Sequence, residues 1–343
     1  MRAIVLNQGF GLDHVRLEER AKPSIIPGHV IVRMQAASLN YRDYMTAIGT
    51  YNPRQPLPLV LGSDGAGIVT EVGEGVTRVK VGDRVMSVFA QDWISGPPTI
   101  KTMRSTLGGP RDGVLAESML VPEHAVVHVP EYLSLEEAAT LPCAAVTAFS
   151  ALTQCGVGPG QVVLVQGTGG VALFALSFAK LFGATVIVTS KSDEKLARAK
   201  TLGADHGLNY RDTPEWGKAA RGIANAAGKD GVDVVIEVGG AGTLAQSMRA
   251  TRPGGAIALI GVLAGGQGAS GLEGALTTAL MSNIRIQGVF VGSRETSEEM
   301  CSSLESSRIR PVIGATFSME DTAIALAHMA EGAHFGKIVI QLR

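Results

Sequence analysis

The chain has 343 residues, of which 45% are apolar and 18% are charged, and its formal net charge is −1. This length is too great for one typical core and predicts two domains of a compact soluble protein. Without a basic stripe, the composition gives no support to nucleic-acid binding or to binding at an anionic membrane.

The N-terminus lacks the apolar core and cleavage site of a signal peptide, and no uncharged apolar run reaches the roughly 18 residues of a membrane span. The three cysteines are widely spaced and include no C-x-x-C pair, which argues against a disulfide framework or a structural zinc lobe. These features predict a protein of the reducing cytoplasm that does not enter membranes.

Residues 1–128 are β-rich. Short runs of β-branched residues, separated by glycine, proline and aspartate, predict strands at 3–6, 15–17, 30–34, 67–72, 84–88 and 117–121. One helix is expected at 41–48. The irregular spacing indicates a twisted, partly open β-barrel, and the long loop at 91–113 is of the kind that carries function or moves.

The pattern changes at Ser134, where Ser134-Leu-Glu-Glu137 forms a capping box that opens a helical stretch. Pro142 is expected to kink or restart this stretch. Strands and helices then alternate, with strands predicted at 162–165, 185–189, 207–210, 232–238, 256–260 and 285–291. Such alternation predicts an α/β fold in which helices cover both faces of a six-stranded parallel sheet.

After residue 292 the sequence predicts helices at 296–306 and 321–330, an extended run at 309–313 and a last strand at 337–342. We expect this segment to return to the β-rich domain. The expected domains are therefore 1–128 together with 293–343, and 129–292.

A glycine turn follows the buried run at 162–165. Gly167, Gly169 and Ala172 occupy the positions of a G-x-G-x-x-G/A motif. Gly167 would allow the tight turn, Gly169 would let a pyrophosphate approach the backbone, and the helix N-terminus would attract its charge. Glycine is abundant, so an ordinary turn is the alternative, but the alternating context favours a dinucleotide site made by Gly167, Thr168, Gly169, Gly170 and Val171.

Taken together, these segments resemble the medium-chain dehydrogenase/reductase superfamily over essentially the whole chain. The matching stretches are Ser38–Asp43, Leu61–Gly67, Val81–Val85, Leu141–Thr147, Gln166–Gly170 and Leu202–Asp205. The resemblance implies a GroES-like, partly open barrel as the catalytic domain and a doubly wound Rossmann domain for the cofactor.

Zinc alcohol dehydrogenases of this superfamily bind a catalytic metal with Cys, His and Cys, beside a glutamate in a Gly-His-Glu run. Here Asn40 replaces the first cysteine, the run reads Gly62-Ser63-Asp64, and Cys143 alone remains. Amide and hydroxyl groups are poor zinc ligands. We therefore expect no metal, with an unusual Asp64–Cys143 site as the alternative.

The stretch from Asn40 to Asp43 is similar to the Asn-x-x-Asp of zinc-free quinone oxidoreductases and enoyl reductases. Those relatives carry a tyrosine eleven residues after the asparagine, and Tyr51 has that position. The resemblance makes Asn40 and Tyr51 the candidate catalytic residues that contact the acceptor oxygen. The alternative is that Asn40 caps a turn and Tyr51 packs, while Arg42 and Asp43 hold the loop.

The predicted strand at 185–189 ends without the acid that NAD-specific relatives use for the ribose 2′-hydroxyl. Ser190, Lys191 and Lys195 offer hydroxyl and ammonium groups to a 2′-phosphate instead. Lys195 and Tyr210 are fifteen residues apart, as are a lysine and tyrosine in NADPH-using quinone oxidoreductases. NADP(H) is therefore the expected cofactor, although the lysines alone would also fit a solvated helix end.

The resemblance also places residues at the nicotinamide end of the cofactor. These are Thr147, the strand ends Val238, Gly261 and Val262, the backbone of Phe290 and Val291, and Lys337 from the returning segment. For Lys337 a surface position is the alternative.

The function expected from these residues is reduction of a small-molecule acceptor, a quinone or an α,β-unsaturated carbonyl, by NADPH without zinc. Three alternatives remain open: an enoyl-thioester reductase, a zinc-free alcohol or carbonyl dehydrogenase, and an NADPH-binding protein with little activity. The exposed edge at 285–291 predicts a homodimer, because pairing would cover it.

Overall fold

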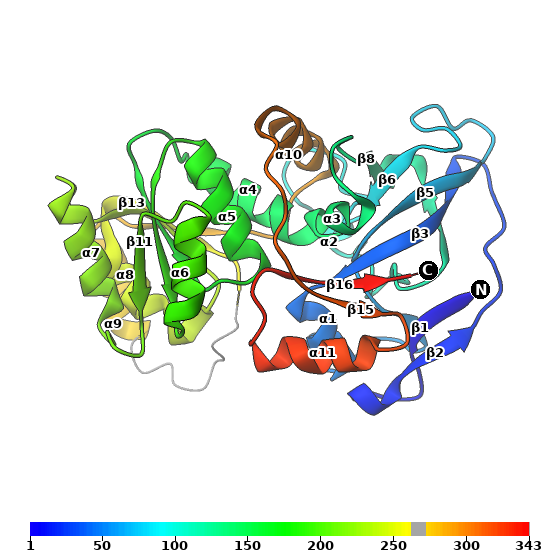
Figure 1. The fold of residues 1–343 in the computed structure, drawn as a ribbon, viewed down its shortest axis with the longest axis horizontal. Helices are drawn as coiled ribbons and strands as arrows, with labels where there is room; N and C mark the ends of the chain where they lie inside the picture. Colours follow the sequence, from blue (N-terminus) through cyan, green and yellow to red (C-terminus); the bar gives the residue numbers. More distant parts are fainter. Residues whose placement is uncertain (262–271, 343) are drawn as a thin grey trace. The chain divides into compact units, whose positions relative to one another are not determined.

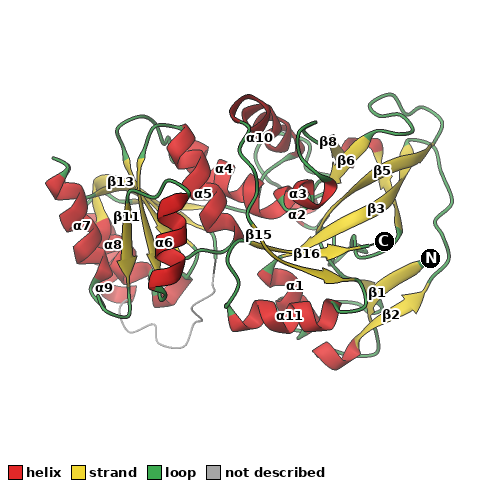
Figure 2. Cartoon of the chain, viewed as in Figure 1, coloured by secondary structure: helices red, strands yellow, loops and turns green. Residues whose placement is uncertain are grey.

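A computed structural model describes residues 1–261 and 272–342 (Figures 1 and 2). The chain forms two compact units. Unit 1 comprises Met1–Val146 and Val291–Arg343, and unit 2 is Thr147–Phe290. The expected domain boundaries at 128/129 and 292/293 stay predictions, and residues 129–146 group with unit 1 by their contacts. In the described part of the chain, no helix combines the length and apolarity needed to cross a bilayer.

Unit 2 contains the six-stranded parallel sheet that the alternating pattern predicts. Its strand order is β11-β10-β9-β12-β13-β14, which is the order of a doubly wound dinucleotide-binding fold. The strands are β9 (Val162–Gln166), β10 (Thr185–Ser190), β11 (His206–Asn209), β12 (Val232–Glu237), β13 (Thr251–Leu259) and β14 (Arg285–Gly288). Every residue of β9 and β12 is buried, because both faces of a parallel sheet are covered.

Helices cover this sheet on both faces (Figure 2). α5 (Gly170–Leu181) packs on β9 and β10, and α6 (Asp193–Thr201) packs on β10 and β11. α7 (Trp216–Ala226) and α8 (Leu244–Ala250) pack on β12 and β13. Unit 2 also contains most of α4 (Val146–Gln154), and α9 (Leu272–Met281). Phe149 of α4 meets Phe178 of α5 edge to face, with ring centroids 5.5 Å apart.

Unit 1 is built around the long strand β3 (His29–Leu39). One sheet has the order β15-β16-β3-β5-β6-β8, with β7 also paired to β3, and a second sheet has the order β2-β1-β4. The remaining strands are β1 (Arg2–Leu6), β2 (Val15–Glu19), β4 (Leu59–Val60), β5 (Asp64–Val72), β6 (Arg84–Ser87), β7 (Ser118–Pro122), β8 (Val126–His128), β15 (Ile313–Ser318) and β16 (Lys337–Gln341).

The C-terminal segment returns to this sheet. β16 pairs antiparallel with β3, and Ile338 lies opposite Leu39. α11 (Thr322–Glu331) packs beside α1 (Tyr41–Ala47) and supplies Leu326 and Met329 to the core of unit 1 (Figure 1). The other helices of unit 1 are α2 (Ile100–Met103), α3 (Leu135–Ala138) and α10 (Arg294–Ser307).

Several elements differ in extent from the sequence-based expectation. The helix around Pro142 is a π-helical turn over Leu141–Ala145, between α3 and α4. β13 begins at Thr251 rather than at 256, with a register shift against β12. β14 ends at Gly288 rather than at 291, and Val291 has a φ of 47°, a left-handed conformation that a β-branched residue rarely adopts.

Candidate active site

Asn40 stands where β3 ends and α1 begins. Its backbone N–H donates to Oδ2 of Asp43 at 2.8 Å, so Asp43 closes the first turn of α1 as a capping carboxylate. The backbone of Asn40 therefore has the capping role that the alternative interpretation foresaw. The oxygen and nitrogen of its side chain also have hydrogen-bond partners.

The Asn40 side chain lies between two polar groups from distant parts of unit 1. Nζ of Lys337 donates to Asn40 Oδ1 at 2.6 Å and to the carbonyl oxygen of Leu39 at 2.7 Å. Nδ2 of Asn40 donates to Oγ of Ser63 at 3.2 Å. Lys337 is only 3% exposed, so it is no surface lysine.

The hydrogen-bond chain continues into the buried carboxyl of Asp64. Oγ of Ser63 donates to Asp64 Oδ1 at 2.8 Å, and the backbone N–H of Cys143 donates to Asp64 Oδ2 at 3.0 Å. The π-helical turn holds this N–H toward Asp64. Burial raises the pKa of Asp64, and the nearby Lys337 charge partly offsets that effect.

Two further groups of this region titrate abnormally because they are buried. Burial raises the pKa of Asp43 from 3.8 to about 6, against the opposing charge of Arg42 and the N–H of Asn40. Burial also raises the pKa of the Cys143 thiol, and the neighbouring Asp64 carboxyl adds to this rise. Cys143 therefore stays a neutral thiol near neutral pH.

Arg42 orders the surroundings of Tyr51. Its guanidinium donates to the carbonyl oxygens of Leu107 at 2.6 Å and Gly109 at 3.0 Å, which ties α1 to the loop at 91–113. The same group lies over the Tyr51 ring, 4.9 Å from its centroid. Tyr51 is 45% exposed, so a ligand can reach it. Arg42 thus holds the loop through carbonyl groups rather than through an ion pair with Asp43.

The residues at Asn40, Ser63 and Cys143 do not fit a zinc ion. The Lys337 ammonium donates to the amide oxygen of Asn40, Ser63 offers only a hydroxyl, and Cys143 is the one good zinc ligand among the three positions. A cation would also meet the positive charge of Lys337. Across the described residues, no group of three His, Cys, Asp or Glu side chains is arranged to hold a metal.

The glycine turn of unit 2 has open space beside its backbone. Gly167 has a φ of 78°, which favours glycine, and a Cβ on Gly167 or Gly169 would meet no protein atom within 4 Å. Packing inside the protein therefore does not explain the glycine at 169, whereas a pyrophosphate close to the backbone would. Gly169 caps the twelve-residue helix α5 without a side-chain cap, so its first-turn N–H groups face this space. Thr168, Gly170 and Val171 belong to the same turn.

Two buried polar residues, which the sequence analysis missed, join the loops at the carboxyl ends of β9 and β12. Nε2 of Gln166 donates to Glu237 Oε2 at 2.6 Å, and Gln166 Oε1 accepts from the backbone N–H groups of Val238 and Gly239. Glu237 Oε1 also accepts from Thr243 Oγ1 at 2.5 Å. Each residue is polar at the end of an apolar strand, and that pattern could have revealed them.

The region after β10 is cationic. Lys191 is exposed, Lys195 is half-buried, and burial together with the charges of Lys191 and Arg198 lowers the pKa of Lys195. Asp193 accepts from Asn209 Nδ2 at 3.0 Å, so its carboxylate is engaged. The backbone N–H of Tyr210 donates to the Ser190 carbonyl at 3.1 Å, which brings the β10 and β11 ends together. Arg198 is a further cation that the sequence analysis did not single out.

The residues expected at the nicotinamide end occupy several places. Thr147 is buried near the start of α4. Gly261 comes soon after the end of β13. It lies so close to Val238 that a Cβ on Gly261 would be 2.2 Å from the Val238 carbonyl oxygen. Phe290 ends unit 2, and the left-handed Val291 begins the second segment of unit 1. Val262 lies outside the described residues.

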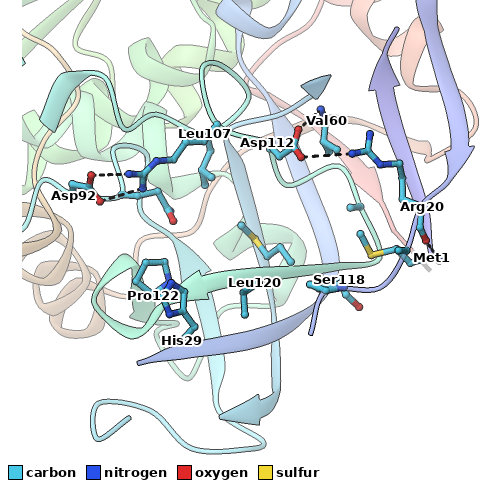
Figure 3. A pocket seen from close by; sticks show the side chains of 17 residues that line it. Met1, Arg20, His29, Val60, Asp92, Leu107, Asp112, Ser118, Leu120 and Pro122 are labelled. Atoms are coloured by element: carbon cyan, nitrogen blue, oxygen red, sulfur yellow. Dashed lines mark hydrogen bonds and ion pairs between the residues drawn. The ribbon is translucent and has the colours of Figure 1, made fainter. Parts of the chain in front are cut away.

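Unit 1 also contains a recess (Figure 3). Its volume is about 540 Å³ and its lining includes none of Asn40, Tyr51 or Lys337. Two of its cations are already paired, since Arg111 makes a bidentate contact with Asp92 and Arg20 lies 4.0 Å from Asp112. The recess therefore has no evident part in the chemistry around Asn40.

Comparison with known families gives two matches. Residues 26–131 match the alcohol dehydrogenase GroES-like domain, and residues 170–306 match the zinc-binding dehydrogenase family. A zinc-type alcohol dehydrogenase-like protein of Schizosaccharomyces pombe is 42% identical over 100% of this chain and 99% of its own length. An acryloyl-coenzyme A reductase of Metallosphaera sedula is 30% identical over 99% of both chains.

A solved structure named as an NAD-dependent alcohol dehydrogenase has a TM-score of 0.89 and 33% identity, and the match covers 99% of each chain. This TM-score shows that the solved relative shares the fold described above. The chain belongs to the medium-chain dehydrogenase/reductase superfamily and is an oxidoreductase that uses a nicotinamide cofactor.

Proposed function

We propose that this protein is an NADPH-dependent reductase that transfers a hydride, without zinc, to an activated acceptor, either a quinone or an α,β-unsaturated carbonyl compound. One observation carries the proposal. The Asn40 amide has its oxygen bound to the Lys337 ammonium and its NH₂ group directed away from it. The region thus offers hydrogen-bond donors to an oxygen, and among the described residues no group of three His, Cys, Asp or Glu side chains is arranged to hold a Lewis-acid metal.

This arrangement suits an acceptor that disperses negative charge itself. When bound, the reduced nicotinamide supplies a hydride to carbon, and the charge of a conjugated acceptor then moves to its carbonyl oxygen. Asn40 Nδ2 donates a hydrogen bond to that oxygen, and Tyr51 donates a hydrogen bond or the balancing proton. Overall the acceptor gains one hydride and one proton. Oxidation of a simple alcohol would instead need a base to remove the hydroxyl proton and a stronger electrophile, such as a metal ion, to stabilise the alkoxide.

The cations after β10 support NADPH as the hydride source. Burial lowers the pKa of Lys195, and the charges of Lys191 and Arg198 add to this effect, so a 2′-phosphate beside these cations would offset their repulsion. The carboxylate that would favour NADH is missing from the end of β10, and Asp193 is bound to Asn209. Because one solved relative is named as NAD-dependent, the preference needs a direct comparison of the two cofactors.

The proposal is tested by following NADPH and NADH oxidation with quinones, enones, enoyl-CoA thioesters and simple aldehydes. We expect turnover of the conjugated acceptors with NADPH, no turnover of aldehydes, and no loss of activity after exhaustive dialysis against a chelator. Activity that needs added zinc would contradict the metal-free mechanism, and consumption of neither cofactor would favour the binding-protein alternative.

An enoyl thioester is a second candidate within the class of activated alkenes. It is favoured by the identity to a protein named as an acryloyl-coenzyme A reductase. A thioester enzyme needs cations for the phosphates of its carrier, and Arg111, one of the arginines of the loop at 91–113, is engaged by Asp92. The enoyl-CoA arm of the same screen decides between this acceptor and a small enone or quinone.

We further propose that the protein forms a homodimer through the edge of its parallel sheet and works in the cytoplasm. β14 is the edge strand, and Ile286 on it is 37% exposed. Leu276, Leu280 and Met281 of α9, the helix that precedes β14 in the chain, are also exposed, at 63%, 79% and 79%. Sedimentation analysis should find a dimer for the wild type and a monomer for Ile286→Glu, and a monomeric wild type would refute the assembly.

A further inference from the structure

We propose that Lys337 acts on the acceptor through Asn40, as a fixed positive charge that orients and polarises the catalytic amide. This inference rests on the proposed function, because it concerns the oxygen that Asn40 would bind. It assigns Lys337 to the acceptor rather than to the cofactor, which the resemblance had suggested. Lys337 is thus a positioning residue, and Asn40 remains the group that touches the acceptor.

The hydrogen bonds fix the orientation of the Asn40 amide. An asparagine side chain has nearly the same shape when its oxygen and nitrogen are exchanged, so its partners must decide which atom lies where. An ammonium group only donates, so the atom 2.6 Å from Lys337 Nζ is Oδ1. Lys337 itself is held in place by the carbonyl oxygen of Leu39 at 2.7 Å.

The other hydrogen bonds in the series from Lys337 to Asp64 agree with this orientation of the Asn40 amide. Ser63 donates its proton to the carboxyl of Asp64, so its oxygen is free to accept from Asn40 Nδ2. The donors therefore run one way, from Lys337 through Asn40 and Ser63 to Asp64. Burial raises the pKa of Asp64, and a hydrogen bond from the Asn40 amide partly offsets this rise. A ligand that reaches Asn40 on the side away from Lys337 meets the Nδ2 end of the amide, which only donates, and this selects an oxygen without a proton to donate.

Burial makes the Lys337 charge effective. Lys337 is 3% exposed, Ser63 and Asp64 are fully buried and Asp43 is 1% exposed, so water screens these groups poorly. The ammonium draws electron density toward Asn40 Oδ1, which makes the N–H groups of the amide stronger donors. As negative charge develops on the acceptor oxygen, this stronger donor stabilises the transition state more than the ground state.

The competing assignment is that Lys337 binds the cofactor, and the variant Lys337→Met separates the two. If Lys337 acts through Asn40, kcat should fall by about 10-fold to 100-fold while the dissociation constant for NADPH, measured by fluorescence titration, changes less than about twofold. Lys337→Arg should restore part of kcat, because it keeps the positive charge. Lys195→Met is the matched control and should weaken NADPH binding instead.

A double-mutant cycle tests the coupling itself. Once Asn40→Ala has removed the amide, adding Lys337→Met should lower kcat by less than about twofold further, because both residues act on one oxygen. Fully multiplicative losses in the double variant would overturn the inference. So would weaker NADPH binding by about 10-fold or more in Lys337→Met with unchanged kcat.

A measurement without turnover keeps the inference testable if Lys337→Met folds poorly or if no acceptor is found. The measurement uses protein labelled with ¹⁵N-asparagine. The chemical shifts of the two Nδ2 protons of Asn40 should change between the wild type and each of the variants Lys337→Gln and Lys337→Arg. The Gln variant should show the larger change, because it removes the charge. Unchanged resonances in both variants would contradict the contact, whereas failure of the acceptor screen alone would contradict only the proposed function.

Discussion

At the scale of single residues, Tyr51 is the group most open to test. It is 45% exposed and its ring is held by the Arg42 guanidinium, so a substitution that keeps the ring should keep the packing. Tyr51→Phe removes only the hydroxyl, and we expect kcat to fall by about 10-fold to 1,000-fold with little change in NADPH affinity. Tyr44→Phe, a substitution at a packing position of α1, is the control. Equal kcat in the Tyr51 variant and the wild type would remove the hydroxyl from the mechanism.

Asp43 should give the protein a distinctive dependence of stability on pH. Burial raises its pKa from 3.8 to about 6, so the folded protein binds more protons than the unfolded chain between these values. The Asp43 contribution to stability is therefore full below pH 4, is lost as pH rises to about 6, and is constant above that. The shift corresponds to about 3 kcal/mol of the free energy of unfolding.

The variant Asp43→Asn keeps an oxygen for the Asn40 N–H but cannot ionise. Urea unfolding from pH 4 to pH 7 should show the variant gaining stability relative to the wild type as pH rises, by up to about 3 kcal/mol. Carboxyls with lowered pKa values, such as Glu117 and Asp205, have the opposite slope, but they cancel in the difference. Parallel pH profiles for the two proteins would show that Asp43 does not titrate in this range.

Residue contacts mark the limit of what the sequence could predict. Asn40 and Tyr51 were predicted from a resemblance to a family that rests on one short segment. The partner of Asn40, Lys337, is 297 residues away, and only the pairing of β16 with β3 brings the two together. The sequence analysis placed Lys337 at the cofactor. A sequence does not tell which group a buried lysine contacts, so the hydrogen bond to Asn40 could not be predicted.

At the scale of elements, α6 tests the preference for NADPH. Lys195 lies in its first turn near Lys191, whereas Lys200 is exposed near its other end. Lys195→Ala should raise KM for NADPH by about 10-fold or more and leave KM for NADH nearly unchanged, because only NADPH carries the 2′-phosphate. Lys200→Ala removes the same charge from the same helix and should affect neither constant. Equal increases in KM for NADPH in the two variants would mean that only the net charge of the protein matters and would contradict a phosphate contact at Lys195.

Elements with strong local signals followed the sequence, and elements shaped by tertiary contacts did not. β9 and α5 were predicted because an apolar run, glycines and a helical stretch occur in order. The same local pattern gave only a kink at Pro142, where the structure has a π-helical turn that aims Cys143 N–H at Asp64. β14 ended early at Gly288, and nothing in the sequence marks Val291 as left-handed.

At the scale of the whole molecule, our proposal divides the chemical task between the two units. Unit 2 contains the glycine turn and the cations proposed to bind the dinucleotide, and unit 1 contains Asn40, Tyr51 and Lys337, which we propose act on the acceptor. The chain leaves unit 1 after Val146 and returns at Val291, so its last strand can place Lys337 beside the first residues of α1. The resemblance foresaw this organisation, but the acceptor depends on side chains that the motifs do not contain.

The central claim is that conjugation in the acceptor replaces a metal ion. The most direct test compares NADPH oxidation by the chelator-treated protein with an α,β-unsaturated ketone and with the saturated ketone of the same carbon skeleton. We predict a rate at least about 100-fold higher for the unsaturated ketone, with no stimulation by added zinc. Equal rates for the two ketones, or a rate that appears only when zinc is restored, would contradict the account.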